Sequence, residues 1–338
     1  MPLLRATRGP ASAGISGFRD MKLIITIDTE EDNWGSYSPT GATLGNTGRI
    51  PALQELFDAF HVRPTYLVTY LVATDMRSVT ILKDILDSGR CEIGTHCHPW
   101  NTPPFEEAPG ERNSMLCNLP ADLQYRKLGA LHNAIAGSFG ITPVSFRAGR
   151  WGYGTDVARN LQKLGYRIDT SITPYINWSN HCGPDFTKVS PQPFRFSSSD
   201  IRRESADGAM LEIPATIGFL QQNFALCNSI LETAKRFPIK YLRPAGILYR
   251  LCLVNKVWLS PEVTDGKTMA KLAQRMMKNN YPVINLVFHS PALKAGLTPF
   301  VKTEEDEGRF LRHIKEFLVF AKDAGIDSMT LSEILKTT

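Results

Sequence analysis

Leu23-Ile24-Ile25-Thr26-Ile27, which runs into Asp28, is the first of four apolar runs that set the architecture of this chain. A short apolar run of this kind predicts a buried strand of a parallel sheet. Three later runs also read as buried strands, and they stop on His96, Arg147 and His289. Because the carboxyl ends of parallel strands converge on one face, we expect these four side chains to share a pocket.

Segments with helical spacing lie between these strands, and this alternation predicts an α/β fold with a parallel sheet. Residues 172–262 break the rhythm with several prolines and a Ser197-Ser198-Ser199 cluster, and we interpret them as an insertion that contains a strand near Met210. The chain has 338 residues, of which 43% are hydrophobic, so residues 21–338 are long enough for one catalytic domain. The helices are expected over residues 50–60, 78–87, 122–139 and 155–164.

Composition excludes several classes of protein. Residues 1–20 hold three arginines among Gly, Ala, Ser and Pro without an apolar core, so we expect a disordered leader and not a signal peptide. No run of about 18 apolar residues predicts a membrane-spanning helix. The six cysteines form no CxxC pair, which favours free thiols and a cytoplasmic location. A net charge of +5 is too small to indicate a nucleic-acid partner.

One segment is distinctly basic. Residues 235–256 contain six Lys or Arg and no acid, interleaved with large apolar residues. We favour a helix whose long basic side chains cover apolar surface. The alternative is peripheral contact with an anionic membrane or a lipid-linked glycan, which would place the protein at the inner membrane surface.

Two pairs of polar residues have the spacing of a metal site. Asp28 and Glu30 stand two residues apart, so in an extended backbone their carboxylates point to the same side, and His96 and His98 repeat this spacing with imidazoles. One carboxylate and two imidazoles, with an open position for water, are typical of a catalytic zinc site. Taken alone, the acid pair fits a polar strand end equally well, and the histidine pair alone fits structural histidines better than a metal site.

The other two strand ends suggest supporting roles. Arg147 is followed by Gly149, Gly152 and Gly154, and an arginine near a carboxylate favours its ionised form and fixes its orientation. His289 ends the most apolar strand of the chain, where an imidazole needs a partner, and it could protonate a leaving group. A buried structural histidine is the alternative for His289.

The order of these segments resembles the polysaccharide deacetylase family, carbohydrate esterase family four. The matching pieces are Thr26-Ile27-Asp28-Thr29-Glu30, Glu92 to Trp100, Phe146-Arg147-Ala148-Gly149 and Leu286-Val287-Phe288-His289-Ser290. The resemblance covers about residues 22–335, with the insertion poorly matched, and it implies a distorted, incomplete (β/α)7 barrel.

The resemblance also implies roles for single residues. Asp28 resembles the general base, Arg147 the arginine that positions this base, and His289 the general acid. Asp169 is similar in placement to the acid that orients this histidine. The aromatic residues near the site are expected to stack on the substrate: Trp34, Trp100, Trp151 and Tyr153.

Three residues depart from the family's pattern. Thr29 replaces the second of two adjacent aspartates, so either Glu30 or Asp28 supplies the carboxylate ligand. Trp100 stands where the second histidine usually lies, and we assign that ligand to His98, as in a subgroup with an HxHPW sequence. Gly149 replaces a proline. Zinc is the expected ion, while cobalt, nickel and manganese also suit these ligands.

The leading hypothesis is a metal-dependent hydrolase that removes N-acetyl groups from a sugar. In a cytoplasmic setting its substrate would be an acetylated saccharide or a nucleotide-linked or lipid-linked polysaccharide precursor. Two alternatives stay open: a hydrolase of a small non-sugar amide or ureide, and a glycan-binding protein that has lost turnover.

Overall fold

The computed structural model describes residues 21–235 and 244–337. Within these residues nine strands form one sheet in the order β11-β1-β2-β3-β4-β5-β8-β6-β7, of which the first seven, from β11 to β8, run parallel. The antiparallel strands β6 and β7 extend it beyond β8. The strands are β1 Lys22–Thr29, β2 Thr65–Val68, β3 Glu92–Cys97, β4 Ser145–Ala148, β5 Ile168–Asp169, β6 Phe194–Ser197, β7 Asp200–Glu204, β8 Met210–Glu212 and β11 Val283–His289.

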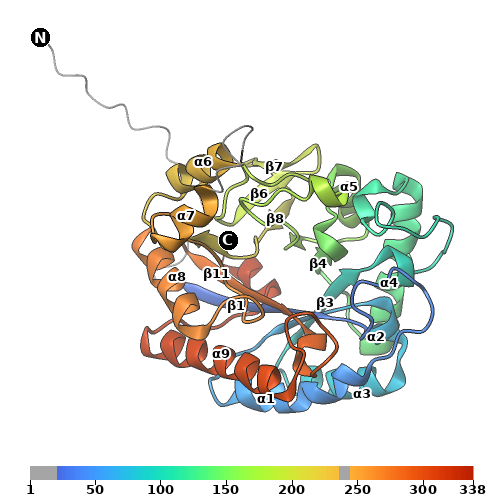
Figure 1. Ribbon diagram of the computed structural model, residues 1–338. Helices are drawn as coiled ribbons and strands as arrows, with labels where there is room; N and C mark the ends of the chain where they lie inside the picture. Colours follow the sequence, from blue (N-terminus) through green and yellow to red (C-terminus); the bar gives the residue numbers. More distant parts are fainter. Residues whose placement is uncertain (1–20, 236–243, 338) are drawn as a thin grey trace, which may run out of the picture.

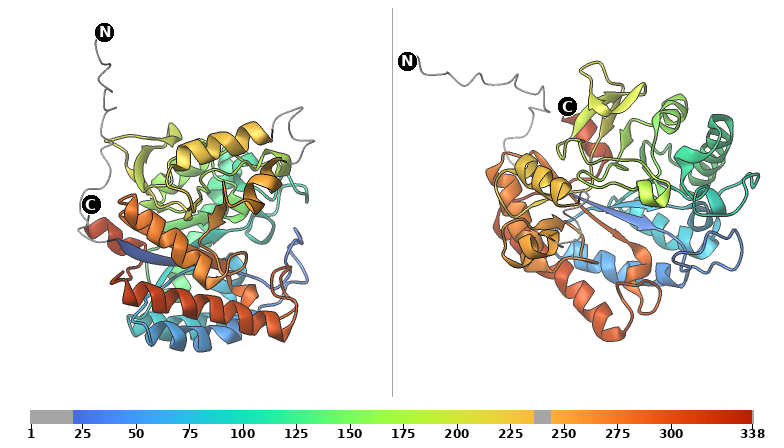
Figure 2. Two further views of the ribbon diagram at one scale, coloured as in Figure 1. Left: turned by 60° about the vertical axis from the view of Figure 1, so that its left-hand side comes forward. Right: turned by 45° about the horizontal axis from the view of Figure 1, so that its top comes forward.

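Helices surround this sheet, with α9, α1 and α3 on one side and α4 and α5 on another (Figure 1). Neighbouring helices pack in pairs, α8 against α9 and α4 against α5, and Figure 2 shows the first pair from the side. The expected α/β fold, a parallel sheet curved into an incomplete (β/α)7 barrel, is confirmed. The helices are α1 Ile50–Asp58, α2 Tyr70–Thr74, α3 Met76–Asp87, α4 Ala121–Phe139, α5 Thr155–Lys163, α6 Phe224–Ala234, α7 Pro244–Arg250, α8 Gly266–Lys278 and α9 Glu304–Asp323.

Irregular chain bridges the two ends of the parallel part of the sheet, from the segment after β8 to the edge strand β11. The backbone N–H of Thr216 donates to the carbonyl of Asn285 at 3.1 Å, and the N–H of Val287 donates to the carbonyl of Leu259 at 3.0 Å. A small second sheet lies beside this bridge and pairs β9 Ile217–Phe219 with β10 Lys256–Trp258. These bonds satisfy backbone groups of β11 that would otherwise form an open sheet edge.

The insertion expected at residues 172–262 needs a correction. Its strand β8 pairs with β5 in parallel register and is the last parallel strand of the barrel, so the segment does not lie wholly outside it. The expected disordered leader lies outside the described residues. All six cysteines are free thiols, as predicted.

Strand register brings the four strand-end residues together. Asp28 on β1 is in register with His289 on β11, and His96 on β3 is in register with Arg147 on β4. In a parallel sheet, residues in register point to the same face. The apolar runs seen in the sequence therefore place the predicted acid, base and ligand residues on one face of the sheet.

A buried lysine anchors the loop that follows the histidines. Nζ of Lys127 on α4 donates to the carbonyls of Pro99, Thr102 and Pro104 at 2.9, 2.7 and 2.7 Å. It also pairs with the carboxylate of Glu107 at 2.8 Å, and its side chain is fully buried. Lys127 thus ties the loop that follows His98 to the barrel.

Lys127→Met is expected to lower the free energy of unfolding by about 3–5 kcal/mol, because it leaves the largely buried carboxylate of Glu107 and three carbonyls without their donor. Urea denaturation measures this loss. The control, Lys83→Met, removes a solvent-exposed partner of Asp87 and is expected to change stability by less than about 1 kcal/mol. Equal effects of the two substitutions would contradict the anchoring role.

Candidate active site and metal centre

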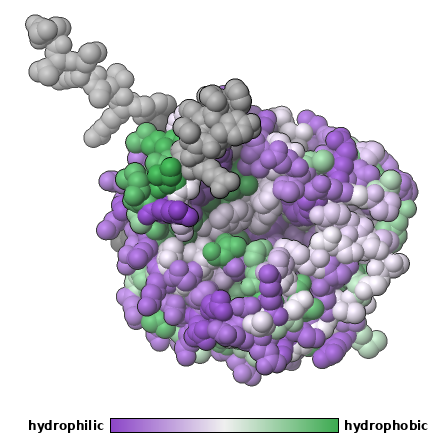
Figure 3. Space-filling model, viewed as in Figure 1, coloured by the Kyte–Doolittle hydropathy of each residue, from purple (hydrophilic) through white to green (hydrophobic). Residues whose placement is uncertain are grey.

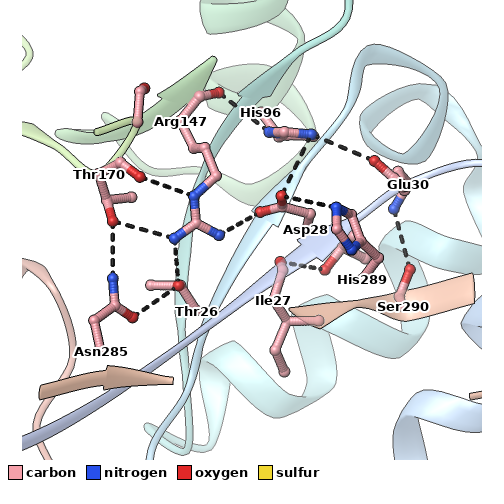
Figure 4. A network of polar contacts seen from close by, with 12 residues as sticks. Thr26, Ile27, Asp28, Glu30, His96, Arg147, Thr170, Asn285, His289 and Ser290 are labelled. Carbon is pink, nitrogen blue, oxygen red and sulfur yellow. Dashed lines mark hydrogen bonds and ion pairs between the residues drawn. The ribbon is translucent and has the colours of Figure 1, made fainter. Parts of the chain in front are cut away.

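The ion pair of Asp28 and Arg147 forms the floor of the site. Nη1 of Arg147 donates to Oδ1 of Asp28 at 2.6 Å, and both side chains are buried. The guanidinium also donates to the hydroxyl of Thr26 and to the carbonyl of Thr170. Asn285 on β11 donates to Thr170 Oγ1 and accepts from the Thr26 hydroxyl, which completes a network inside the barrel (Figure 4).

This network keeps Asp28 ionised. Burial alone would raise the pKa of Asp28, but the guanidinium of Arg147 and the imidazoles of His96 and His289 hold it below its usual value. Oδ1 is occupied by Arg147, whereas Oδ2 lies 3.8 Å from His96 Nε2 and 3.6 Å from His289 Nε2. Asp28 therefore presents one fixed oxygen and one oxygen that faces the pocket.

Glu30, His96 and His98 form a cluster that suits a metal ion. Oε2 of Glu30 lies 3.3 Å from Nε2 of His96 and 3.1 Å from Nε2 of His98. One ligand atom from each of the three buried residues lies within 4.8 Å of the others. Asp28 is not part of this group, so the geometry favours Glu30 as the carboxylate ligand over Asp28.

Each histidine of the cluster is oriented through its other nitrogen. Nδ1 of His96 contacts the backbone carbonyl of Arg147 at 3.1 Å, and Nδ1 of His98 contacts Oε1 of Glu31 at 2.8 Å. Protons on both Nδ1 atoms leave both Nε2 lone pairs directed at Glu30, which is the tautomer that a metal ligand requires. Glu31 was not predicted from the sequence, although it adjoins Glu30 in a run of two acids.

His289 stands beside Asp28 and is held by an acid that the sequence analysis missed. Its Nδ1 contacts both carboxylate oxygens of Glu262 at 3.1 Å. Burial alone would lower the pKa of His289, but the carboxylates of Glu262, Glu30 and Asp28 raise it to about 9. These carboxylates therefore favour the protonated form of His289, which a general acid requires.

The expectation that Asp169 orients His289 is wrong. Asp169 accepts hydrogen bonds from the backbone N–H and the hydroxyl of Ser171, and it interacts electrostatically with the buried carboxyl group of Glu212. Burial raises the pKa of both acids. Strand pairing explains this placement, because Asp169 and Glu212 are in register on β5 and β8, away from β11.

The cluster lies in a pocket of about 520 Å³. All five tryptophans of the chain line this pocket: Trp34, Trp100, Trp151, Trp178 and Trp258. Trp34 packs edge-on against the ring of His289 at 4.7 Å, and Trp100 stacks on His98 at 4.1 Å. The structure thus brings three predicted aromatic residues to the site and adds two, Trp178 and Trp258, from the segment interpreted as an insertion.

Tyr153 is a second correction. The tyrosine is only 1% exposed and packs against Phe146 and Phe196, so it belongs to the core and not to the pocket lining.

Arg150 and Trp151 reach the pocket because their backbones adopt positive φ values of 53° and 60°. This costly conformation places the Trp151 ring over the guanidinium of Arg147 at 5.1 Å.

Gly149 allows the turn after β4 to pass close to His98. A Cβ at this position would lie 2.7 Å from the carbonyl of Cys97 and would overlap the His98 ring. The glycine that replaces the proline of the family pattern therefore has a local reason: only a residue without a side chain leaves room for this imidazole.

Comparisons with known proteins support the fold. No protein-family model matches the chain, and no curated protein matches it in sequence. A structure described as a candidate polysaccharide deacetylase from Mycobacterium smegmatis is 15% identical, with a TM-score of 0.54 over 96% of this chain and 93% of that one. A candidate glycoside hydrolase/deacetylase from Parabacteroides distasonis is 12% identical, with a TM-score of 0.59 over 97% of this chain and 72% of that one.

A third similar structure has a different activity. The 4-alpha-glucanotransferase from Thermococcus litoralis is 12% identical, with a TM-score of 0.53 over 94% of this chain and 40% of that one. At these identities the likeness establishes a shared fold, and the chemistry has to be argued from the side chains of this chain.

Gly149→Ala is expected to weaken metal binding by about 10- to 100-fold, because the added methyl group displaces the His98 imidazole. Titration with Zn²⁺ followed by calorimetry measures this change, and His98→Ala provides the reference for a lost ligand. Gly129→Ala is the matched control, because a Cβ at Gly129 on α4 meets nothing within 4 Å. Wild-type zinc affinity in Gly149→Ala would show that His98 does not bind the ion in this orientation.

Proposed function

We propose that this protein is a metal-dependent hydrolase of the polysaccharide deacetylase type that removes an N-acetyl group from a sugar. The observation that carries the proposal is the position of Asp28 and His289. They lie side by side on β1 and β11, next to a Glu-His-His cluster at the base of a pocket lined with tryptophan. An acyl-transfer reaction to water needs these parts within reach of one substrate carbonyl.

The donor set fits a divalent cation, most simply Zn²⁺. Glu30, His96 and His98 would hold it through one oxygen and two nitrogen atoms. A cation with this ligand set supplies a Lewis acid for the amide carbonyl and lowers the pKa of the attacking water. We infer that these three residues serve as ligands in the same way as in the HxHPW subgroup that the sequence resembles.

Asp28 and His289 divide the proton transfers. Oδ2 of Asp28 accepts a proton from the water that attacks the carbonyl carbon, while Arg147 holds the other oxygen of Asp28 in place. Nε2 of His289 donates a proton to the amide nitrogen as the carbon–nitrogen bond breaks. The products are acetate and a free amine, and the second proton of the water is lost from the acetic acid. Glu262 fixes the ring of His289 and stabilises its charged form.

The pocket favours a saccharide substrate. Tryptophan rings offer flat apolar faces with a polar edge, which suits the alternating apolar faces and hydroxyl edges of a pyranose ring. The substrate is then an acetylated saccharide or a nucleotide-linked or lipid-linked precursor of a polysaccharide. Small cyclic amides and ureides could stack on the same rings, so the assay has to include them.

Asp28→Asn is expected to lower kcat by about 10²- to 10⁴-fold without loss of zinc, because the amide cannot accept the proton of the attacking water. The measurement is acetate release from N-acetylglucosamine oligomers and from a nucleotide-linked N-acetyl sugar, with zinc content determined on the same samples. Asp32→Asn is the control, because Asp32 caps the Thr43–Asn46 turn and does not face the cluster.

Three results of this assay would overturn the proposal. A wild-type rate in Asp28→Asn would remove Asp28 as the base. Release of ammonia or formate from cyclic amides, without acetate from sugars, would favour the non-sugar hydrolase. Saccharide binding by the zinc-loaded wild type without hydrolysis would favour a silent glycan-binding protein.

Glu262→Gln is expected to move the alkaline limb of the kcat/KM profile to lower pH. The carboxylate of Glu262 raises the pKa of His289, so its removal lowers that pKa, and the general acid loses its proton earlier as pH rises. Asp169→Asn is the control, because Asp169 does not contact His289. The alkaline limb of the kcat/KM profile of this variant is expected to stay at the wild-type pH. A shift in Asp169→Asn but not in Glu262→Gln would restore the assignment made from the sequence.

A further inference from the structure

Large apolar side chains gather on the outer surface of α6, α7 and the turn that follows α7. Six of them are between 37% and 63% exposed, and they form the α6–α7 patch: Leu226, Ile230, Ile247, Tyr249, Leu251 and Leu253. Figure 3 shows apolar surface gathered in this region of the molecule, at the upper left. Exposed apolar residues scattered singly are ordinary, whereas a contiguous group marks a contact surface.

The inner faces of these helices already serve the core. Phe224, Cys227 and Leu231 of α6 are buried, and Leu248 of α7 packs against the same core. Leu226 and Ile230 on α6 and Ile247 and Tyr249 on α7 are therefore additional apolar surface that packing within the described chain does not use. A helix that is apolar on both sides is expected where a second apolar phase covers its outer side.

Hydrogen bonds hold the turn of the patch in place. Nε2 of Gln221 donates to the carbonyl of Cys252 at 2.8 Å, and Nδ2 of Asn255 donates to the carbonyl of Tyr249 at 3.0 Å. Gln221 and Asn255 also bond to each other at 3.0 Å. Leu251 and Leu253 are thus presented by a fixed turn and not by a loose end.

The chain around the patch carries an excess of positive charge. Between residues 232 and 261 the sequence has one acid, Glu232, which pairs with Lys235 at 2.8 Å, and six Lys or Arg: Lys235, Arg236, Lys240, Arg243, Arg250 and Lys256. Lys235 and Arg250 are exposed at the ends of α6 and α7. Residues 236–243, which supply three of the six cations, lie outside the described residues, so only their composition enters this argument.

We propose that the α6–α7 patch is a docking surface for an anionic lipid bilayer. The apolar side chains would enter the boundary between headgroups and acyl chains, and the surrounding cations would lie against lipid phosphates. Apolar side chains flanked by an excess of cations match the chemistry of such a bilayer, which offers hydrocarbon beneath negative charge. The contact is peripheral, since none of the described helices is long and apolar enough to cross a membrane.

The patch adjoins the pocket along the chain. Strand β10 begins three residues after Leu253, and its Trp258 lines the pocket. Docking through α6 and α7 would hold the pocket close to a membrane surface, where a lipid-linked saccharide would be presented. Lipid binding itself requires neither the metal site nor turnover, so it can be tested apart from the proposed hydrolysis.

The test is flotation of the full chain with vesicles of phosphatidylcholine alone and of phosphatidylcholine with phosphatidylglycerol. The wild type is expected to float with the anionic vesicles and not with the neutral ones, and to be released at high salt. The double substitution Leu251→Glu and Leu253→Glu is expected to reduce partitioning at least tenfold. The matched control introduces two glutamates at exposed apolar positions elsewhere, Met76→Glu and Val319→Glu, and is expected to bind like the wild type.

Circular dichroism and zinc content of each variant confirm that it is folded. The single substitution Arg250→Glu, which leaves the apolar side chains intact, is expected to weaken binding to the anionic vesicles. Three outcomes overturn the proposal: no vesicle binding by the wild type, equal binding to both kinds of vesicle, or equal loss in the patch and control variants. If light scattering instead shows a wild-type dimer that the patch substitutions dissociate, without vesicle binding, a second copy of this chain covers the patch.

Discussion

The buried ion pair of Asp28 and Arg147 is the interaction on which the rest of the site depends. Removing two charges from water is costly, and such pairs are weak evidence for stability. Here further hydrogen bonds from across the barrel support the pair. Thr26 and Thr170 accept hydrogen bonds from the remaining N–H groups of Arg147, and Asn285 is hydrogen-bonded to both threonines. Arg147 also acts through its backbone, whose carbonyl orients His96. One residue therefore fixes both the proposed base and one proposed metal ligand, so any shift of β4 would disturb both.

Strands and loops make different contributions to the site. Strand register places Asp28, His96, Arg147 and His289, whereas the loops supply the acids that orient the imidazoles: Glu31 for His98 and Glu262 for His289. A histidine held through Nδ1 has its Nε2 aimed at a fixed point, and both loop acids are used in this way. The barrel thus sets the positions of the reactive groups, and the loops set their direction and protonation.

The sequence predicts well the site residues that lie on strands, and it predicts poorly the site residues that lie on loops. An apolar run that ends in a polar residue indicates both a buried strand and the end of that strand at which a reactive side chain lies. This pattern is why Asp28, Arg147 and His289 could be predicted. The partner of His289 could not be found in this way, because Glu262 reaches it across 27 residues of chain from a loop without periodicity. Asp169 was assigned from the family resemblance alone, but its strand lies beside β8 and not beside β11. Asn285 could have been identified from the sequence, because it is the one polar residue in the apolar run Val-Ile-Asn-Leu-Val-Phe. A buried amide of this kind requires hydrogen-bond partners.

The charge balance of the site gives an independent physical argument for a cation. Four nearly buried carboxylates, Asp28, Glu30, Glu31 and Glu262, face one guanidinium, that of Arg147, so four negative charges stand against one positive charge before the histidines are counted. Although burial opposes it, Glu31 and Glu30 raise the pKa of His98 to about 10, and Glu262 has the corresponding effect on His289. The carboxylates therefore favour a positive charge at both His98 and His289. The two histidines differ in whether a metal ion or a proton can carry that charge. Nε2 of His98 points at Glu30 and His96, where a divalent ion can replace the proton and also balance the excess charge. Nε2 of His289 points at Asp28, which Arg147 already pairs, so His289 keeps its proton and has it available for a leaving group.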